Sequence, residues 1–475
     1  MRDVLVALAI LISLPTCFRR PFVGLVLFSL LAYMRVQDLT WGFAREMRWS
    51  YYVALVTLAG FVAQRVDKQF FKPDPRTWIM FALALVIGLG IILSAGSGEL
   101  PTFQFTNFLK VVAVALFTTG IVRERRQLRV LLWVFALSFG FYGLKSGLAG
   151  VLSFGNLTIL QGPGGMLADN NDFALALCMA LPLLVHLGAA EKNVLLRRAL
   201  WVLVPFTVLT VVLTYSRGGF LALAVTILVL CWRSRNRLAG LATLGLFALA
   251  GLAIAPTKYV ERISTIADYQ TEGSAQGRLQ AWGVAWTMIK DNPVMGVGFN
   301  RFQENYARYD PVIVTDEMAE GRTRVAHNSY LQIWAEGGSI AFGLYLLLIV
   351  LSFTDLWRLR RRARRRYYSS WILSYTSMLE ASMAAFLVGS TFLNRAHFDL
   401  FYHYVAVILV FTVLARRQMD AEDAGGAGSG RRGQGAISAS SRAPGGGRSS
   451  LGGAGLGGPG GRRLVPAHGL RNTPG

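Results

Sequence analysis

The sequence predicts an all-α integral membrane protein of about 12 transmembrane helices, because roughly 20 apolar residues cross a bilayer core as a helix. Its 475 residues are 53% hydrophobic and only 16% charged, whereas about a quarter of an ordinary soluble domain is charged. Apolar runs of roughly 15–22 residues, long enough to span a bilayer, recur from Val4 to Leu414. These observations exclude a large soluble enzyme.

Each predicted helix follows an apolar run that ends at a turn or a basic cluster. The runs cover residues 22–36, 50–65, 78–96, 105–122, 129–147, 171–189, 198–214, 217–233, 238–256, 337–355, 371–392 and 399–415. A shorter run at 4–16 either crosses the membrane as an additional helix or forms a shallow hairpin with the next one. Cys17, Cys178 and Cys231 lie in or beside these runs without metal-ligand spacing, so we expect buried thiols rather than a disulfide framework.

The net charge of +22 would suggest a nucleic-acid partner in a soluble protein, but here the basic residues encode orientation. They concentrate in alternate loops, at 65–76, 123–129, 192–198, 233–237, 358–366 and 416–417. Short loops rich in Lys and Arg stay in the cytoplasm. The intervening loops carry few basic residues, at 96–101, 145–170, 215–218 and around Arg395. We therefore expect those loops on the outer face and no nucleic-acid partner.

The chain is expected to have four segments. Residues 1–254 and 337–417 would hold the N-terminal and C-terminal transmembrane helices, and residues 255–336 would form a large loop on the outer face. Residues 418–475 are dominated by Gly, Ser, Ala and Arg. Such a composition cannot bury an apolar core, so we expect a disordered cytoplasmic tail without chemistry of its own.

The large loop is expected to be partly helical. Segment 277–291 repeats apolar residues at helical spacing, at Leu279, Trp282, Trp286 and Ile289. Asn292 and Pro293 end this helix, and residues 301–309 have the pattern of a second, short one. We expect an amphipathic domain that lies on the outer surface of the membrane.

Arg217 is the first candidate for chemistry. It follows Tyr215 and Ser216 in a turn between two apolar helices, on the face where basic residues are scarce. An Arg that reaches back to the interface would be a purely structural alternative. A helix N-terminus beside an Arg also binds anions well, and Gly218 and Gly219 allow close approach. The pattern favours a phosphate or pyrophosphate clamp at the outer membrane boundary.

Arg278 and His327 are the other two candidates. We expect Arg278 in the first turn of the loop helix, where the helix dipole disfavours a cation unless an anion binds there; a surface pair with Glu272 is the alternative. His327 precedes Asn328 and Ser329, which are good helix caps, so a hydrogen-bonded His of a capping region is the alternative. An imidazole beside anion clamps is a natural general base for a hydroxyl group.

The remaining polar residues have simpler interpretations. Residues 169–172 are expected to cap the helix that follows the glycine-rich loop 162–165, with a contact to a sugar as the alternative. Lys110 and Glu380 lie within apolar spans and are either functional or paired with each other. The loop acids lack the spacing of a metal site, so we expect solvated charges and no metal or other cofactor: Asp310, Asp316, Glu317 and Glu320.

Together these segments resemble the O-antigen ligase/polymerase superfamily of bacterial inner-membrane glycosyltransferases. The matching segments are YSRGGFLA at 215–222, GRLQAW at 277–282, NPVMGVGFN at 292–300 and HNSYLQ at 327–332. A long outer loop before the last helices also fits, and the likeness covers about residues 60–415. The N-terminal half further resembles O-glycosylation-ligase-like members.

The resemblance implies an O-antigen ligase of lipopolysaccharide biosynthesis, a GT-C-like enzyme of the inner membrane whose active site faces the periplasm. The donor would be a glycan on undecaprenyl pyrophosphate, and the acceptor would be lipid A–core oligosaccharide. Arg217 and Arg278 would bind the pyrophosphate, and His327 would activate the acceptor hydroxyl for inverting, metal-independent transfer. Three further residues are expected to contact substrate: Tyr215, Trp282 and Asn328.

Two groups of alternatives stay open. Within the superfamily, the same motifs would serve a polymerase of O-antigen or exopolysaccharide, or a protein O-oligosaccharyltransferase. In a different class, a transporter of polyprenyl-linked glycans would have broken spans and midplane charges in related halves. The distinctive polar residues gather instead on one face and in one loop, which favours an enzyme.

Overall fold

The computed structural model is mostly helical and separates into two units, residues 1–422 and 423–475. It describes residues 2–64, 69–93, 99–154, 156–165, 167–234, 273–310, 324–365 and 370–439. The predicted span at 238–256 lies outside these residues, as do Glu272, Asp316, Glu317 and Glu320.

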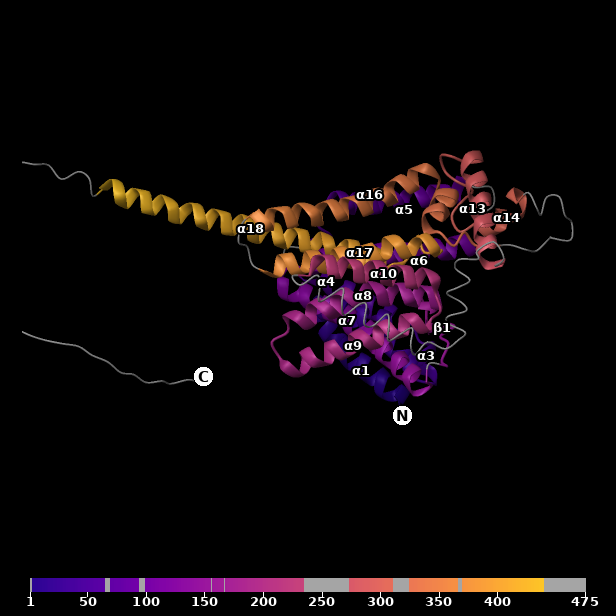
Figure 1. Cartoon of the computed structure of the whole chain (residues 1–475), viewed down its shortest axis with the longest axis horizontal. Helices are drawn as coiled ribbons and strands as arrows, with labels where there is room; N and C mark the ends of the chain where they lie inside the picture. Colours follow the sequence, from indigo (N-terminus) through magenta and orange to yellow (C-terminus); the bar gives the residue numbers. More distant parts are fainter. Residues whose placement is uncertain are drawn as a thin grey trace, which may run out of the picture. The chain divides into compact units, whose positions relative to one another are not determined.

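The first half of the chain is a series of apolar helices (Figure 1). They are α1 (Arg2–Arg19), α2 (Pro21–Tyr33), η1 (Val36–Leu39), α3 (Phe43–Glu46), α4 (Trp49–Ala63), α5 (Pro75–Leu93), α6 (Glu99–Ile121) and α7 (Arg125–Leu152). Pro21 occupies the first position of α2, where its missing N–H costs no hydrogen bond. The chain therefore turns directly from α1 into α2, and both pack against α4.

A short antiparallel hairpin precedes the central helices. Strands β1 (Gln161–Gly164) and β2 (Leu167–Asp169) pair with each other and are a short addition to a fold that is otherwise helical in the described residues. Gly164, with a φ of 103°, supplies the left-handed backbone that the hairpin needs. The helices that follow are α8 (Asn170–Ala190), α9 (Val194–Leu213) and α10 (Arg217–Arg233).

Helix α8 forms the centre of the bundle. It packs against α7, α9, α10 and α17, and each residue from Phe173 to Leu184 is buried. A helix that is apolar on every side belongs in such a core. On one side of it, α7 and α9 approach closely because a Cβ on Gly147 would lie 2.6 Å from the carbonyl oxygen of Phe206.

The second half of the chain begins with two helices of the large loop. They are α13 (Gly273–Asp291) and α14 (Phe302–Tyr309), followed by α16 (Ser329–Arg365), α17 (Ser370–Gly389), η3 (Ser390–Phe392) and α18 (Asp399–Ala439). Helix α13 runs across the ends of the long helices and contacts α16 (Figure 1). The predicted helix at 301–309 is confirmed by α14.

The apolar face of α13 differs from the predicted stripe. The buried residues are Ala281, Val284, Ala285, Met288 and Ile289. Leu279 is 53% exposed and Trp286 is 46% exposed, so the predicted stripe is wrong for these two residues. Small side chains let the helix pack closely, whereas Trp286 remains at the rim with its ring 5.7 Å from that of Trp334.

Helix α16 is broken near its start. Gly338 has a φ of 69° and a ψ of −174°, which interrupts the helical hydrogen bonds. The segment after α13 replaces them, because Val297 N–H donates to the Ala335 carbonyl at 2.8 Å and Ser339 N–H donates to the Pro293 carbonyl at 2.8 Å. The break therefore fixes the end of α13 against α16.

The membrane class is confirmed in general terms. Eight of the described helices are long and apolar enough to cross a membrane, and α2 and α4 are shorter apolar helices. Helix α18 continues to Ala439, so the predicted start of the tail at 418 is not the end of the helix. Residues 418–424 include good helix formers such as Gln, Met, Glu and Ala. Residues 440–475 lie outside the described part of the chain.

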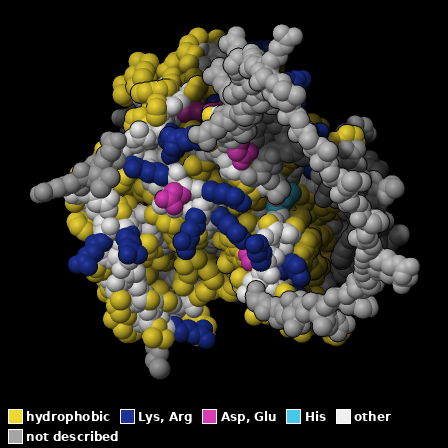
Figure 2. Space-filling view, turned by 90° about the vertical axis from the view of Figure 1, so that its left-hand side faces the viewer, with side chains coloured by type: hydrophobic (Ala, Val, Ile, Leu, Met, Phe, Trp, Pro, Cys, Tyr) yellow, Lys and Arg dark blue, Asp and Glu magenta, His cyan; other side chains and the backbone are white. Residues whose placement is uncertain are grey.

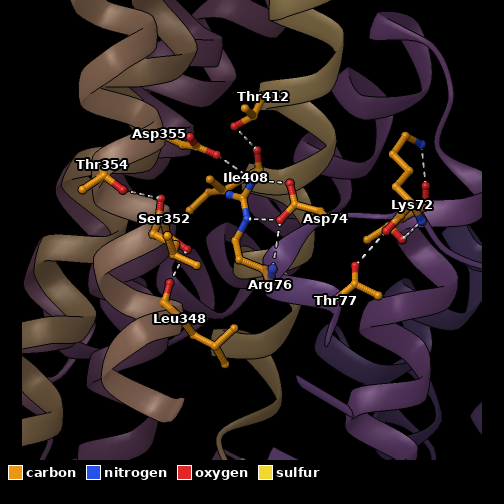
Figure 3. Close-up of polar contacts among 12 residues, drawn as sticks. Lys72, Asp74, Arg76, Thr77, Leu348, Ser352, Thr354, Asp355, Ile408 and Thr412 are labelled. Atoms are coloured by element: carbon orange, nitrogen blue, oxygen red, sulfur yellow. Dashed lines mark hydrogen bonds and ion pairs between the residues drawn. The ribbon is translucent and has the colours of Figure 1, made fainter. Parts of the chain in front are cut away.

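Ion pairs join the helices at the end of the bundle away from α13. Arg76 is 1% exposed and contacts Asp74 and Asp355 of α16, each at 2.8 Å (Figure 3). Arg416 of α18 contacts the same Asp355 at 2.6 Å. Figure 2, which views the molecule from the side where α16 ends, shows many Lys and Arg side chains among few acidic ones. Such a basic end agrees with the expected clustering of basic loops.

The expected alternative of a Lys110–Glu380 pair is wrong. Glu380 contacts Arg360 at 2.6 Å and Arg233 at 2.9 Å. Lys110 donates to Asn107 at 3.2 Å on an exposed surface. Glu380 is therefore a structural residue that joins α10, α16 and α17.

Candidate functional site

The start of α10 places Arg217 at a capped helix N-terminus, as predicted. Ser216 Oγ accepts a hydrogen bond from Gly219 N–H at 3.0 Å and donates to Asn171 Oδ1 at 2.6 Å. Tyr215 has a φ of 51°, which turns the chain from α9 into α10. Arg217 is the first residue of α10 and is half-buried. The cap and the contact with Asn171 fix the position from which its guanidinium extends.

Arg278 lies in the second turn of its helix rather than the first, because α13 begins at Gly273. The predicted conflict with the helix dipole is therefore weaker than expected, since that effect fades beyond the first turn. Arg324 packs directly over this region, and a Cβ on Gly277 would lie 1.5 Å from its Nη1 atom. The guanidinium of Arg324 therefore lies against the helix segment that carries the half-buried Arg278.

His327 occupies a constrained position immediately before α16. Its φ is 45°, a left-handed conformation that costs energy in a non-glycine residue and is concentrated at functional sites. On one side, Trp282 Nε1–H donates to the Ala326 carbonyl at 3.0 Å. On the other side, Asn328 Oδ1 accepts hydrogen bonds from the N–H groups of Tyr330 and Leu331, at 3.0 and 3.1 Å. These bonds fix the backbone on both sides of the imidazole.

The surroundings of His327 favour its neutral form. Burial lowers its pKa from the ordinary value of 6.5, and the charges of Arg278 and Arg324 lower it further. Asp169 raises the pKa and so opposes them. An imidazole whose pKa is lowered in this way is unprotonated at neutral pH and can accept a proton.

The turn between α17 and α18 brings a residue that sequence reasoning did not select. Arg395 forms an ion pair with Asp172 in the first turn of α8, and its backbone N–H donates to Ser329 Oγ at 2.9 Å. Burial lowers the pKa of the Arg395 guanidinium, but the hydrogen bond to Asp172 and the charge of Asp172 raise it, and the net shift is upward. The sequence did hold a signal for Arg395, and it is the same one that identified Arg217: each is a basic residue on the side where basic residues are scarce.

The structure brings most of the predicted residues to one end of the bundle. The charges of Arg278, Arg324 and Asp169 act on His327, and Arg217 begins a helix whose cap bonds to Asn171, two residues after Asp169. Asp169 also caps α8 by accepting from Asn171 N–H at 2.8 Å, which confirms the predicted cap.

Two of the three predicted substrate-binding residues form structural hydrogen bonds. Trp282 and Asn328 use polar atoms to hold the backbone around His327, and Tyr215 is half-buried at the turn before Arg217. Among the loop acids, Asp310 is 1% exposed and accepts a hydrogen bond from Gln280 at 2.8 Å, so the expectation of a solvated charge is wrong there. Within the described ranges, no three His, Cys, Asp or Glu side chains form a metal-binding group.

Comparison with known families divides the chain into two matched regions. Residues 199–346, which include Arg217, Arg278 and His327, match the family model described as O-antigen ligase. Residues 1–192 match a family of unknown function. No curated protein matches the chain significantly.

Proposed function

We propose that the chain is a member of the O-antigen ligase superfamily, whose family model matches residues 199–346, and that it transfers a glycan from undecaprenyl pyrophosphate to lipid A–core oligosaccharide. The reaction takes place at the periplasmic face of the bacterial inner membrane. The observation that carries this proposal is the position of His327, a half-buried imidazole with a lowered pKa on which the charges of Arg278 and Arg324 act.

His327 acts as the general base. It accepts the proton of the acceptor hydroxyl as the oxygen attacks the anomeric carbon of the donor glycan. A bond forms between that oxygen and the anomeric carbon, while the bond from the carbon to the phosphate oxygen breaks. The electron pair leaves with undecaprenyl pyrophosphate, and attack from the opposite side inverts the configuration.

Arg217 and Arg278 bind the pyrophosphate of the donor. Negative charge grows on the phosphate oxygen as the bond to the sugar breaks, and preorganised cations stabilise it in the transition state. Guanidinium groups suit this task because they bind phosphate oxygens with two N–H groups at once. The N-terminus of α10 adds backbone N–H groups that favour an anion at the same place.

Substitution of the three residues tests the mechanism. We expect Arg217→Ala and Arg278→Ala to lower kcat by about 100-fold or more, and His327→Ala to lower it by about 100- to 10,000-fold. Transfer is measured in proteoliposomes that contain the full chain and the lipid-linked donor. Arg197→Ala, at an exposed position in the first turn of α9 at the other end of the bundle, is the control and retains activity. Near-normal transfer by all three variants would contradict the proposal.

The acceptor is tested separately. Purified protein receives undecaprenyl-pyrophosphate glycan with lipid A–core, with a pilin-like protein, or with no added acceptor. Capped lipid A–core is the expected product. A glycosylated protein would identify a protein ligase, and a lengthened lipid-linked glycan would identify a polymerase. Transfer in the presence of EDTA tests metal independence, because a metal-dependent reaction would stop.

A further inference from the structure

A continuous chain of hydrogen bonds connects the start of α10 with the start of α8. Ser216, the N-cap of α10, donates to Asn171 Oδ1 at 2.6 Å. Asn170 Nδ2–H donates to the Thr214 carbonyl at 2.9 Å, in the turn just before Ser216. The first residues of α8 therefore hold both the turn and the cap that precede Arg217.

The chain continues from α8 to the segment before α18. Asp172, which follows Asn171, is 2% exposed and forms an ion pair with Arg395. The backbone N–H of Arg395 donates to Ser329 Oγ at 2.9 Å, and Ser329 Oγ donates to the Leu393 carbonyl at 2.8 Å. Ser329 is the first residue of α16 and lies two residues after His327.

The Asp172–Arg395 pair is the one charged contact in this chain of bonds, and it joins residues 223 positions apart in the sequence. Removing one member of a buried pair leaves the other charge without compensation, which is strongly destabilising. The rest of the guanidinium is accessible, since the Arg395 side chain is 36% exposed. The pair thus has a buried anchor and a partly open cation beside the site.

We propose that Asp172 and Arg395 are a positioning pair that sets the distance between the pyrophosphate clamp at Arg217 and the base at His327. The inference rests on the proposed function. Neither residue takes part in proton transfer or contacts the leaving group. Their role is to fix the position of the start of α10 relative to the start of α16. The donor and the acceptor hydroxyl then meet at reacting distance.

The pair should affect turnover more than donor binding. Arg217 and Arg278 still bind the pyrophosphate when the pair is broken, whereas a displacement of about 1 Å between reacting groups can cost about 100-fold in rate. We expect Arg395→Gln and Asp172→Asn to lower kcat by about 10- to 100-fold while the donor KM changes by less than about threefold. Arg395→Lys keeps the charge and restores part of the activity.

The double variant Asp172→Asn/Arg395→Gln separates a pair from two independent residues. If both act through one contact, its kcat is close to that of either single variant, because effects within one contact are not additive. Arg129→Gln is the matched control. It breaks an ion pair with Glu191 at the opposite end of the same α8 helix and leaves kcat unchanged. Additive losses, or an unchanged kcat in Arg395→Gln, would overturn the inference.

Hydrogen exchange supplies a readout that does not depend on transfer activity. In Arg395→Gln, amides at 213–219 and 327–331 exchange faster than in the parent protein, because the contact that joins these segments is lost. In Arg129→Gln they exchange at the parent rate. Faster exchange confined to 393–398 would show that the pair holds only its own loop, and would overturn the inference. If the parent protein transfers no glycan but the exchange result holds, the proposed function fails and the positioning contact stands.

Discussion

At the residue scale, the protonation of His327 depends on its neighbours. Burial, Arg278 and Arg324 lower its pKa below the ordinary value of 6.5, so the imidazole stays neutral as the pH falls through 6.5. A general base works only in its neutral form, and kcat/KM reports the ionisation of the free enzyme. We expect the acid limb of the kcat/KM profile to have an apparent pKa below 6.5.

Removing one of the cationic charges near His327 should move the acid limb of the kcat/KM profile to higher pH. In Arg324→Gln a cation near His327 is lost, the pKa of the imidazole rises, and the acid limb moves to higher pH. Arg308→Gln is the control, because Arg308 lies over Tyr309 on α14 and its charge is not among those that act on His327. A limb that stays in place in Arg324→Gln would exclude His327 as the titrating base.

Trp282 provides a second prediction at this scale. Its indole N–H donates to the Ala326 carbonyl, and Trp282→Phe removes that bond while keeping an aromatic ring. Loss of one neutral hydrogen bond costs about 0.5–1.5 kcal/mol, and the backbone before His327 gains freedom. We expect a lower kcat with a lower melting temperature, measured by transfer assay and thermal unfolding in detergent.

Trp286→Phe is the matched control for this change. Trp286 lies one turn further along α13, is 46% exposed and makes ring contacts with Trp334. Its replacement should leave kcat unchanged. Equal losses of kcat in the two variants would show that α13 needs both indoles for packing, and would refute a specific role for the Trp282 bond.

At the element scale, the break in α16 positions the start of that helix. Gly338 has a left-handed φ of 69°, and a Cβ there would lie 2.0 Å from the Val294 carbonyl oxygen. Gly338→Ala therefore has to move backbone, and we expect destabilisation of about 1–3 kcal/mol, the range for a strained residue. Thermal unfolding in detergent measures the effect.

Gly343→Ala tests the same substitution where the helix is regular. A Cβ at Gly343 meets no atom within 4 Å, and Ala is favoured over Gly in a helix by about 1 kcal/mol in water. Gly343→Ala should leave the melting temperature unchanged or raise it slightly. If Gly338→Ala were equally well tolerated, the break would be a soft bend rather than a fixed feature of the fold.

The elements that the sequence predicts best are the membrane helices. Apolar runs long enough to cross a bilayer are a local property, so α5, α6, α8 and α17 appear close to the predicted positions. The break at Gly338 was missed, because it depends on a carbonyl of Pro293 from another element. The buried face of α13 was also misassigned, since packing against α14 and α16 selects small residues over Trp286.

Some residues of the candidate site could likewise be predicted from the sequence, and others could not. Arg217 stands out in the sequence as a basic residue on the face where basic residues are scarce, and His327 as an imidazole in a polar loop beside the candidate anion clamps. Arg324 and the Asp172–Arg395 pair could not be found from spacing. Arg324 lies over Gly277 only after the loop has folded, and the pair joins the start of α8 to a turn that lies far from it in the sequence.

At the scale of the whole molecule, the two ends of the bundle differ in chemistry. The end where α16 finishes carries many Lys and Arg side chains (Figure 2), and ion pairs such as Arg76–Asp355 join its helices. The opposite end carries α13 and the candidate site. Basic loops stay on the cytoplasmic side, so this asymmetry favours a site that faces the periplasm.

Cysteine labelling tests that orientation, and the chain is well suited to it because Cys17, Cys178 and Cys231 are buried. Phe154 is 88% exposed and follows α7 at the end of the bundle where Ile159 N–H donates to the Leu213 carbonyl, just before Arg217. We expect Phe154→Cys to react with a membrane-impermeant maleimide in cells with a permeabilised outer membrane.

Lys192→Cys is the counterpart at the opposite end of the bundle, in the exposed turn between α8 and α9. It should react only after the inner membrane is broken, because its loop is basic and stays in the cytoplasm. The parent protein, with buried thiols alone, sets the background. The reverse pattern, with Lys192→Cys labelled in intact inner membranes and Phe154→Cys protected, would place the site in the cytoplasm. A ligase that meets its lipid-linked donor on the periplasmic side could not have that orientation, so the labelling result tests the proposed function without any assay of transfer.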